Sequence, residues 1–391
     1  MEMNETRSLL VTIRDRWLAS AGPDGLVPGP FLDARDISDL AASTGWAGMH
    51  LARAIRLAFE PFDDESIDRL FVPTRAPRFR GRTPHRADLL AILAGRIPAL
   101  AAKVLFHGLA GGMRVILKPS SAETVFPALL VNSIMLLERD APVSVAPGRG
   151  PALDAMIRSA TACVAYGSDM TVEAIAAARR GRPTFPGRHM ESFETVFADA
   201  IESNDEARAV AEKIAFDTAI YDQSGCLSPT VVFVQEGGGV SARAFAGMLL
   251  EALSGSQLAM GPMEIDDLAA VRIFIQEAAI GRIKDPVFSR EDVIPPAVVL
   301  CDRVRPSPGL RTLQVVPFDS PVPDLSRHMP DLADRIQGMA CAGSDGEVGW
   351  LLRKNPRFRA NHICAPGELQ NPPALWRENG IVLAHELLGI Q

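Results

Sequence analysis

Short apolar runs alternate with longer amphipathic stretches from residue 88 onward. Four of these runs are short enough to be buried strands, namely residues 89–93, 113–118, 143–146 and 162–166. Helical periodicity fills the intervals, with proline or glycine near several ends, at residues 98–110, 122–138, 153–159 and 171–179. Because short apolar strands that alternate with helices build a parallel sheet with both faces covered, the pattern predicts a doubly wound α/β domain.

A second alternation begins after the Pro/Gly segment at residues 183–187. It indicates a helix over residues 205–220 and strands at residues 194–198, 231–234, 298–301 and 313–316. The part of the chain before residue 88 is broken by prolines and has helical periodicity at residues 37–59. We therefore expect two α/β domains.

Composition and charge narrow the function classes. The 391 residues carry 40 Lys and Arg against 47 Asp and Glu, a net charge of −7, so no basic surplus favours nucleic acid as a partner. No apolar stretch reaches the ~18 residues that cross a bilayer, and the N-terminus holds no apolar signal-peptide core. The five cysteines form no Cys-x-x-Cys pair, which argues against a disulfide framework or a metal site and indicates the reduced cytoplasm.

Four loops fall at the carboxyl ends of the predicted strands of the first sheet, where doubly wound sheets bind ligands. They are residues 95–98, 118–121, 147–150 and 167–168. Lys118 and Ser120 can offer an ammonium and a hydroxyl to ribose or phosphate oxygens, and glycines let the backbone approach a pyrophosphate. Each loop alone is more often structural. In succession they favour a nucleotide site, although no Gly-x-Gly-x-x-Gly follows the first strand.

One cysteine stands out from the others by its setting. The turn at residues 221–229 (Tyr-Asp-Gln-Ser-Gly-Cys-Leu-Ser-Pro) places Cys226 in a polar, glycine-containing loop just before a strand. Such a loop can hold a thiol near backbone N–H groups and favour its reactive thiolate form. A free cysteine is more often structural, and Cys163 and Cys301 lie inside apolar strands and fit that interpretation. Cys226 is therefore the candidate nucleophile.

Three motifs occur here in the order and spacing of the aldehyde dehydrogenase superfamily. They are Lys-Pro-Ser at residues 118–120, Gly-Ser at residues 167–168, and the Gln-x-Gly-Cys-x-Ser-Pro turn around Cys226. Within the superfamily the chain most resembles the bioluminescence-type long-chain acyl-CoA reductases, with further matches at residues 93–98 and 366–376. The resemblance runs from about residue 89 to the C-terminus.

The resemblance implies an aldehyde-dehydrogenase-like fold of two doubly wound α/β domains with a small oligomerisation element. Residues 1–188 would bind the cofactor, and residues 189–364 would carry the nucleophile. Residues 365–391 would return the chain and supply a strand at 381–388 to a partner subunit. The resemblance also implies a homodimer or homo-oligomer that takes an acyl-CoA or acyl carrier protein thioester with NADPH or NADH.

The family's residue roles transfer to the matching positions. Cys226 would accept the acyl group. Lys118 would contact the adenosine ribose of the cofactor, and Ser120 its neighbouring oxygens. The pyrophosphate and adenosine cleft would be lined by three residues, Gly148, Gly167 and Ser168.

Two positions depart from the family's pattern. Residues 184–189 (Thr-Phe-Pro-Gly-Arg-His) stand where hydrolytic aldehyde dehydrogenases carry a water-activating glutamate, so we expect an acyl-enzyme here to resist water. Arg96 stands where the family has an oxyanion-binding asparagine. Its guanidinium can point toward Cys226 as a stronger donor, or turn to solvent or an acidic neighbour. His189 is a candidate acid for the departing thiolate, although a histidine is more often structural.

Several interpretations of the function stay open. The leading one is the reduction of an acyl thioester to an aldehyde. The alternatives are a CoA-acylating or hydrolytic aldehyde dehydrogenase, and a catalytically inactive homologue that serves as a binding or scaffold subunit. The basic run at residues 75–86 is either a solvated face or a receptor for the phosphates of a CoA or carrier-protein arm.

Overall fold

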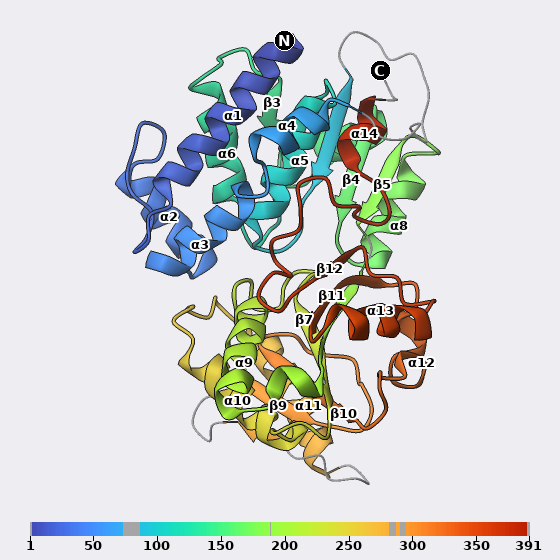
Figure 1. Ribbon diagram of the computed structural model, residues 1–391. Helices are drawn as coiled ribbons and strands as arrows, with labels where there is room; N and C mark the ends of the chain where they lie inside the picture. Colours follow the sequence, from blue (N-terminus) through green and yellow to red (C-terminus); the bar gives the residue numbers. More distant parts are fainter. Residues whose placement is uncertain (1, 73–86, 188, 281–286, 290–294, 389–391) are drawn as a thin grey trace. The chain divides into compact units, whose positions relative to one another are not determined.

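The computed structural model describes residues 2–72, 87–187, 189–280, 287–289 and 295–388 (Figure 1). The chain divides into two compact units. Unit 1 comprises Met1–His189 and Asn371–Gln391, and unit 2 comprises Met190–Gln370, so unit 2 is inserted into the sequence of unit 1. The basic run at 75–86 lies outside the described residues. Within the part of the chain that is described, no helix combines the length and the apolar character needed to cross a membrane.

Unit 1 contains a five-stranded parallel sheet of order β3-β2-β1-β4-β5. Its strands are β1 (Asp88–Ile92), β2 (Arg114–Lys118), β3 (Val143–Val145), β4 (Ala162–Tyr166) and β5 (Thr184–Gly187). The helices between them are α5 (Pro98–Ala110), α6 (Val125–Met135), α7 (Pro151–Ser159) and α8 (Asp169–Ala178). The strand order reverses between β1 and β4, which confirms the predicted doubly wound topology.

The sequence pattern predicted the first four strands to within one residue at each end. It did not predict β5, because Pro186 and Gly187 read as a break in the chain. β5 is the edge strand of its sheet, where a missing backbone N–H costs little, so it accommodates the proline.

The N-terminal residues form four helices, α1 (Met3–Ser20), α2 (Ala34–Thr44), α3 (Gly48–Phe59) and α4 (Asp64–Leu70). The helical stretch predicted over residues 37–59 is two helices, because Gly45 takes a left-handed conformation (φ 77°) and ends α2. The pattern did not predict α1, which buries Trp17 completely. The Trp17 ring stacks on Phe59 at 5.7 Å between centroids and meets Phe126 edge-on at 5.3 Å. This helix therefore belongs to the core of unit 1.

Unit 2 contains a seven-stranded sheet of order β12-β11-β6-β7-β10-β9-β8, parallel except for the pairing of β8 with β9. Its strands are β6 (Glu191–Val196), β7 (Pro229–Gln235), β8 (Val287–Ser289), β9 (Ala297–Leu300), β10 (Thr312–Phe318), β11 (Ile336–Ala342) and β12 (His362–Cys364). Its helices are α9 (Asn204–Ala219), α10 (Ala242–Gly255), α11 (Ile265–Ile280), α12 (Leu325–His328) and α13 (Asp345–Lys354). The sequence pattern predicted β6, β7, β9, β10 and α9, but neither β11 nor β12.

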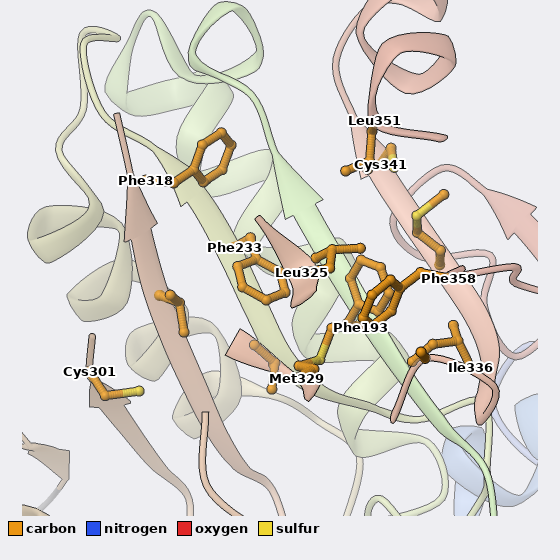
Figure 2. Close-up of a cluster of buried hydrophobic side chains, with 14 of the residues drawn as sticks. Phe193, Phe233, Cys301, Phe318, Leu325, Met329, Ile336, Cys341, Leu351 and Phe358 are labelled. Atoms are coloured by element: carbon orange, nitrogen blue, oxygen red, sulfur yellow. The ribbon is translucent and has the colours of Figure 1, made fainter. Parts of the chain in front are cut away.

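Apolar side chains cover both faces of the unit 2 sheet. On one face, Phe193 and Phe233 meet edge-on at 5.7 Å between ring centroids, within a cluster that includes Met329 and Phe358 (Figure 2). On the other face, residues of α9 and α10 such as Phe245 pack against the same strands. A sheet buried on both faces needs apolar residues at successive positions, which explains the continuous apolar runs of the sequence.

The closing segment folds into unit 1 as a helix. The strand predicted at 381–388 is wrong, because Leu383–Leu388 forms α14 and buries Leu383, Ala384 and Leu387 in its own chain. The backbone N–H of Ala384 donates to Nδ1 of His107 on α5 at 3.1 Å. The other ring nitrogen, Nε2, therefore carries the proton and donates to the Ala374 carbonyl at 2.9 Å.

A second set of polar contacts holds the same segment. Lys103 on α5 forms an ion pair with Glu378 at 2.7 Å and lies over the Trp376 ring, 4.5 Å from its centroid. The Tyr166 hydroxyl, at the end of β4, donates to Glu378 at 2.8 Å. The described part of the segment that begins at Asn371 is thus packed within unit 1.

Candidate active site

The candidate residues of unit 1 lie at the carboxyl ends of its strands. Arg96 follows β1, Lys118 ends β2, Gly148 follows β3, and Gly167 follows β4. The reversal of strand order between β1 and β4 is the point at which doubly wound sheets bind their ligands. The sequence-predicted loops therefore share one edge of one sheet.

Two cations approach each other on neighbouring loops of this edge. Partial burial, with a smaller contribution from the Arg149 guanidinium, lowers the pKa of Lys118. Lys118 ends β2 and Arg149 follows β3, the strand next to it. Two like charges held near each other favour an anionic ligand that would lie against both.

Ser120 is buried and uses its hydroxyl within the protein. Its Oγ donates to the Gly95 carbonyl at 2.6 Å and accepts from the Glu123 backbone N–H at 3.0 Å. Glu123 in turn accepts from the backbone N–H groups of Val125 and Phe126 at the start of α6, at 2.7 and 2.9 Å. Ser120 thus ties the loop after β1 to the loop after β2 and fixes the backbone beside Lys118.

The Arg96 side chain lies over the same turn. Its Nε donates to the Ala122 carbonyl at 3.4 Å. Burial raises the pKa of the Glu123 carboxyl, and the hydrogen bonds that it accepts and the nearby Arg96 charge oppose part of that rise. Within unit 1 the structure therefore brings Arg96 close to an acidic neighbour.

The loop after β4 leads directly into a helix. Gly167 has a φ of 149°, a conformation that favours glycine. Ser168 is the N-cap of α8, since its Oγ accepts from the Thr171 backbone N–H at 3.3 Å. His189 has an exposed side chain, and its backbone N–H donates to Oδ1 of Asp169, the first residue of α8, at 3.1 Å.

This edge of unit 1 combines open space beside the backbone, helix N-termini and cations. Gly148 is exposed, and a Cβ atom built on it would meet nothing within 4 Å, which leaves room for a ligand near the backbone. Helices α7 and α8 both begin here, and helix N-termini attract phosphate groups. With Lys118 and Arg149 beside them, these residues fit an anionic dinucleotide.

The candidate nucleophile belongs to unit 2. It lies near the amino end of its strand, whereas the candidate residues of unit 1 lie at the carboxyl ends of their strands. Cys226 is half-buried in the turn between α9 and β7, and so precedes its strand. Asp222 and Gln223 take positive φ values of 50° and 57° in this turn. Asp222 pairs with the buried Arg311 at 2.6 Å, and Gln223 donates to the Pro229 carbonyl at 2.7 Å. The strained turn is therefore anchored on both sides.

Side chains from neighbouring strands hold Cys226 itself. The Ser192 hydroxyl, on β6, donates to the Cys226 carbonyl at 2.7 Å and accepts from the Gly338 backbone N–H at 2.8 Å. The Gln337 amide, on β11, donates through Nε2 to the Cys226 Sγ at 3.8 Å. Asn361, just before β12, donates to the Gln337 Oε1 at 2.9 Å.

The sequence motifs did not indicate Ser192, Gln337 or Asn361. Their residue types carry no motif, and Gln337 lies on β11 and Asn361 just before β12, two strands that the pattern did not predict. What these residues share is their position. Each stands at or just before the start of its strand, and the three strands, β6, β11 and β12, lie on the same side of β7 in the sheet.

Cys163 and Cys301, which the sequence pattern indicated as structural, are buried, and so is Cys341. Burial raises the pKa of the Cys163 thiol to about 11 and that of Cys341 to about 12. Cys364 is half-buried, and its burial, with the nearby carboxylates, raises the pKa of its thiol as well. Neutral, inaccessible thiols are poor nucleophiles, which leaves Cys226 as the better candidate.

A buried acidic pair lies in the core of unit 2. Burial and the neighbouring Asp217 raise the pKa of Glu194 well above its usual value. Burial raises the pKa of Asp217 to about 7, even though its carboxylate accepts from the Gly367 backbone N–H at 2.6 Å. Neither oxygen of Glu194 has a hydrogen-bond partner among the described residues. Within those residues, no three His, Cys, Asp or Glu side chains are grouped so as to hold a metal ion.

Comparison with known proteins adds a family and a fold. A family model described as "Acyl-CoA reductase (LuxC)" matches residues 60–382. An oxidoreductase from Marinobacter aquaeolei is 15% identical, with a TM-score of 0.70 over 94% of this chain and 78% of that chain. The P. syringae indole-3-acetaldehyde dehydrogenase AldA, solved with NAD⁺ and IAA, is 14% identical, with a TM-score of 0.68 over 94% and 77%.

A NAD-dependent benzaldehyde dehydrogenase from Corynebacterium glutamicum is also similar, at 14% identity and a TM-score of 0.68 over 94% of this chain and 82% of that chain. Because the identities are this low, these similarities show the fold alone. The TM-scores confirm the aldehyde-dehydrogenase-like fold predicted from the sequence. The curated protein sequences contain no match to this chain.

Proposed function

The chain belongs to the acyl-CoA reductase (LuxC) family, and from this premise we propose that it reduces an acyl thioester to an aldehyde through an S-acyl intermediate on Cys226. Family and fold make it an aldehyde-related oxidoreductase. The proposed part is the thioester substrate, carried by CoA or an acyl carrier protein, and the cysteine chemistry. The observation that carries it is the half-buried Cys226 thiol, held in an anchored turn with an amide donor at its sulfur.

The first chemical step uses the thiolate of Cys226. Its sulfur attacks the thioester carbonyl, a new C–S bond forms, and the carrier thiolate leaves and takes up a proton. We propose His189 as the acid that supplies this proton. We further propose that Arg96, with the backbone N–H of Cys226, donates hydrogen bonds to the oxyanion, where preorganised donors contribute most to the rate.

Unit 1 is the proposed cofactor domain. Lys118 would bind the adenosine ribose, and Ser120 would hold the loop that positions Lys118. The phosphates would lie along Gly148, Gly167 and Ser168. We propose NADPH, with NADH as the alternative, because Arg149 follows the strand next to the one that Lys118 ends, and a second cation could pair with a 2′-phosphate. When bound, the reduced nicotinamide supplies the hydride that the acyl carbon requires.

The strand β5 supports a thioester reductase over a hydrolytic dehydrogenase. It consists of Thr184, Phe185, Pro186 and Gly187, none of which can act as a water-activating carboxylate. A Cβ atom at Gly187 would lie 2.2 Å from the Tyr166 ring, so this position has no room for a side chain. Without a base to activate water, the S-acyl enzyme should persist until it is reduced or returned to a thiol.

Assembly and location follow from the same proposal. The resemblance leads us to propose a homodimer or larger homo-oligomer, which sedimentation velocity measures directly. Because α14 is packed inside unit 1, the contacts between copies would use other residues. A reactive thiolate suits the cytoplasm, where thiols stay reduced.

The test follows acyl mass on the protein. Purified protein is mixed with a panel of acyl-CoA thioesters without nicotinamide cofactor, and the intact mass is recorded. We expect one acyl group per chain, slow decay in buffer, and rapid loss on adding NADPH, with aldehyde released, or on adding free CoA. Rapid decay to free acid would favour a hydrolytic dehydrogenase, and the lack of any adduct would favour an inactive homologue.

A further inference from the structure

We propose that Gln337 is a catalytic residue that stabilises the Cys226 thiolate by an N–H···S hydrogen bond, and that Asn361 is the positioning residue that orients its amide. The inference rests on the proposed function, since it assumes that Cys226 is the nucleophile. It goes further by assigning roles to two residues that have none in the family motifs identified in the sequence.

The contact is made by a buried amide. Gln337 is 1% exposed, and its Nε2 lies 3.8 Å from the Cys226 Sγ, within hydrogen-bond range for sulfur. The two residues are 111 positions apart in the sequence. A buried amide N–H pays a desolvation cost unless it finds an acceptor, and the sulfur is an acceptor that improves greatly when it carries a charge.

Asn361 decides which end of the amide faces the sulfur. Its Nδ2 donates to the Gln337 Oε1 at 2.9 Å, so the NH₂ group of Gln337 is the end left to face Cys226. The backbone reinforces this arrangement, because the Asn361 N–H donates to the Gln337 carbonyl at 2.9 Å. The parallel pairing of β11 with β12, with Gly338 opposite His362, keeps the two side chains in register.

The turn around Cys226 makes such a donor useful. Thiolates are often stabilised at the N-terminus of a helix, but Cys226 lies between the end of α9 and the start of β7. A neutral amide offers stabilisation without a fixed charge. Because it is neutral, it also leaves the sulfur nucleophilic.

The same hydrogen bond would act late in the reaction. When the thiohemiacetal collapses, its C–S bond breaks, the electron pair stays on sulfur, and the oxyanion becomes the aldehyde carbonyl. The sulfur changes from a neutral thioether to a thiolate, so an N–H donor binds the product side more strongly than the starting side. Gln337 would therefore favour the thiolate at two points. The first is the ionisation of the free Cys226 thiol, and the second is the departure of the Cys226 sulfur from the thiohemiacetal.

The experiment measures the thiolate without acyl substrate or cofactor. The rate of alkylation of Cys226 by iodoacetamide is recorded from pH 5.5 to pH 10, with Cys226→Ala protein as the blank. In Gln337→Met, which keeps the side-chain volume but has no donor, the midpoint of the profile should rise by about one pH unit. This is the size expected when one hydrogen bond to a charged group is lost. Gln337→Glu should raise it further.

Asn361→Asp tests the positioning role. The new carboxylate cannot donate to Oε1, so the Gln337 amide should turn over and present its oxygen to the sulfur. The midpoint should rise in Asn361→Asp, and the rise should be smaller when Gln337→Met is already present. The two rises, one in the parent background and one in the Gln337→Met background, are then subtracted. The subtraction cancels the direct effect of the added charge and of every other titratable group, because both backgrounds share them.

Each outcome decides the matter. A Gln337→Met profile that matches the parent overturns the catalytic role, and equal effects of Asn361→Asp in both backgrounds overturn the positioning role. Should Gln337→Met fail to fold, Gln337→Glu takes its place both as the variant without the amide donor and as the background for Asn361→Asp, with Tm measured for each. A shifted alkylation profile in protein that forms no acyl adduct would uphold Gln337 and reject the proposed function.

Discussion

The two units are built on the same principle and place their candidate residues at opposite ends of their strands. In unit 1, Lys118 and Gly167 lie at the carboxyl ends of β2 and β4, beside helices that begin there. In unit 2, Cys226, Gln337 and Ser192 lie at or before the amino ends of β7, β11 and β6. The general rule for doubly wound sheets therefore locates the first set and overlooks the second.

The chemistry of the two edges differs accordingly. The unit 1 edge offers cations and helix N-termini, which suit phosphate groups. The unit 2 edge offers hydroxyl and amide donors around a thiol, which suit a group that gains and loses charge during a reaction. This difference supports our proposal that unit 1 binds the cofactor and unit 2 carries the covalent chemistry. Variants that damage the activity proposed for the other unit would contradict it.

The largest expected effect is a clean separation of the two activities. Cys226→Ala should abolish acyl adduct formation and leave NADPH affinity unchanged. Lys118→Ala should weaken NADPH binding about tenfold, the value of one hydrogen bond to a charged group, and leave the adduct intact. Intact-mass spectrometry and cofactor fluorescence titration measure the two quantities.

Cys163→Ala provides the matched control, since that thiol is buried in β4 and should be dispensable for the adduct. Loss of both activities in either of the first two variants would mean that the units do not divide the work.

The next effect concerns Arg96, the unit 1 residue proposed to serve the oxyanion. Arg96→Ala should slow acylation by ~10²-fold, the usual result of removing an oxyanion donor, and Arg96→Asn should recover part of the loss. Stopped-flow release of CoA measures the rate. An unchanged rate would confine Arg96 to the contacts seen within unit 1, with the Ala122 carbonyl and Glu123.

A smaller effect is the pH dependence of unit 2. Glu194 and Asp217 have folded-state pKa values raised above their unfolded values, to about 7 for Asp217. The folded state keeps these protons while the unfolded state loses them. For Asp217, stability should therefore fall as pH rises from about 4 through about 7, by up to about 1.4 kcal/mol per pH unit, and Glu194 should add to the fall in the same direction. Glu194→Gln should reduce the fall. Hydrogen exchange of β6 and β11 amides at pH 5.5 and pH 8 measures it, and equal slopes in variant and parent would contradict the assignment.

The pH dependence of stability in unit 1 should have the opposite sign to that in unit 2, and it is the smallest of the expected effects. Burial lowers the pKa of His107 to about 3, below its unfolded value. The unfolded state therefore takes up a proton that the folded state refuses, and stability should fall as pH drops below about 6.5. His107→Phe should lose this acid sensitivity and cost about 1–3 kcal/mol through the unpaired Ala374 and Ala384 backbone groups. Exchange of α5 amides is the readout, and acid sensitivity that survives the substitution would point to another group.

Local signals in the sequence were sufficient for much of unit 1. The helix over Pro98–Ala110 and the strand over Ala162–Tyr166 match their predicted bounds, because proline, glycine and a short apolar run mark them unambiguously. α1 also carried a signal, since Leu9, Leu10, Ile13 and Trp17 follow a helical spacing. The charged residues between them obscured it.

The surroundings of the nucleophile depend on pairings that no local pattern encodes. Cys226 could be singled out because its turn has a distinctive composition. Gln337 reaches it only because β11 lies two strands from β7, with β6 between them. Such an order is set by the packing of the whole sheet, and a one-residue change of register would turn each side chain to the other face.

The insertion of unit 2 within unit 1 has a consequence for how the chain matures on the ribosome. All residues of unit 2 are made before Asn371, so this unit can fold while the last segment of unit 1 is still unmade. Until residues 374–384 emerge, the imidazole of His107 and the ammonium of Lys103 lack the partners that satisfy them in the finished protein. Translation that stops short of these residues would leave a complete unit 2 attached to an unfinished unit 1, with the side of α5 that packs on α14 exposed to chaperones and proteases.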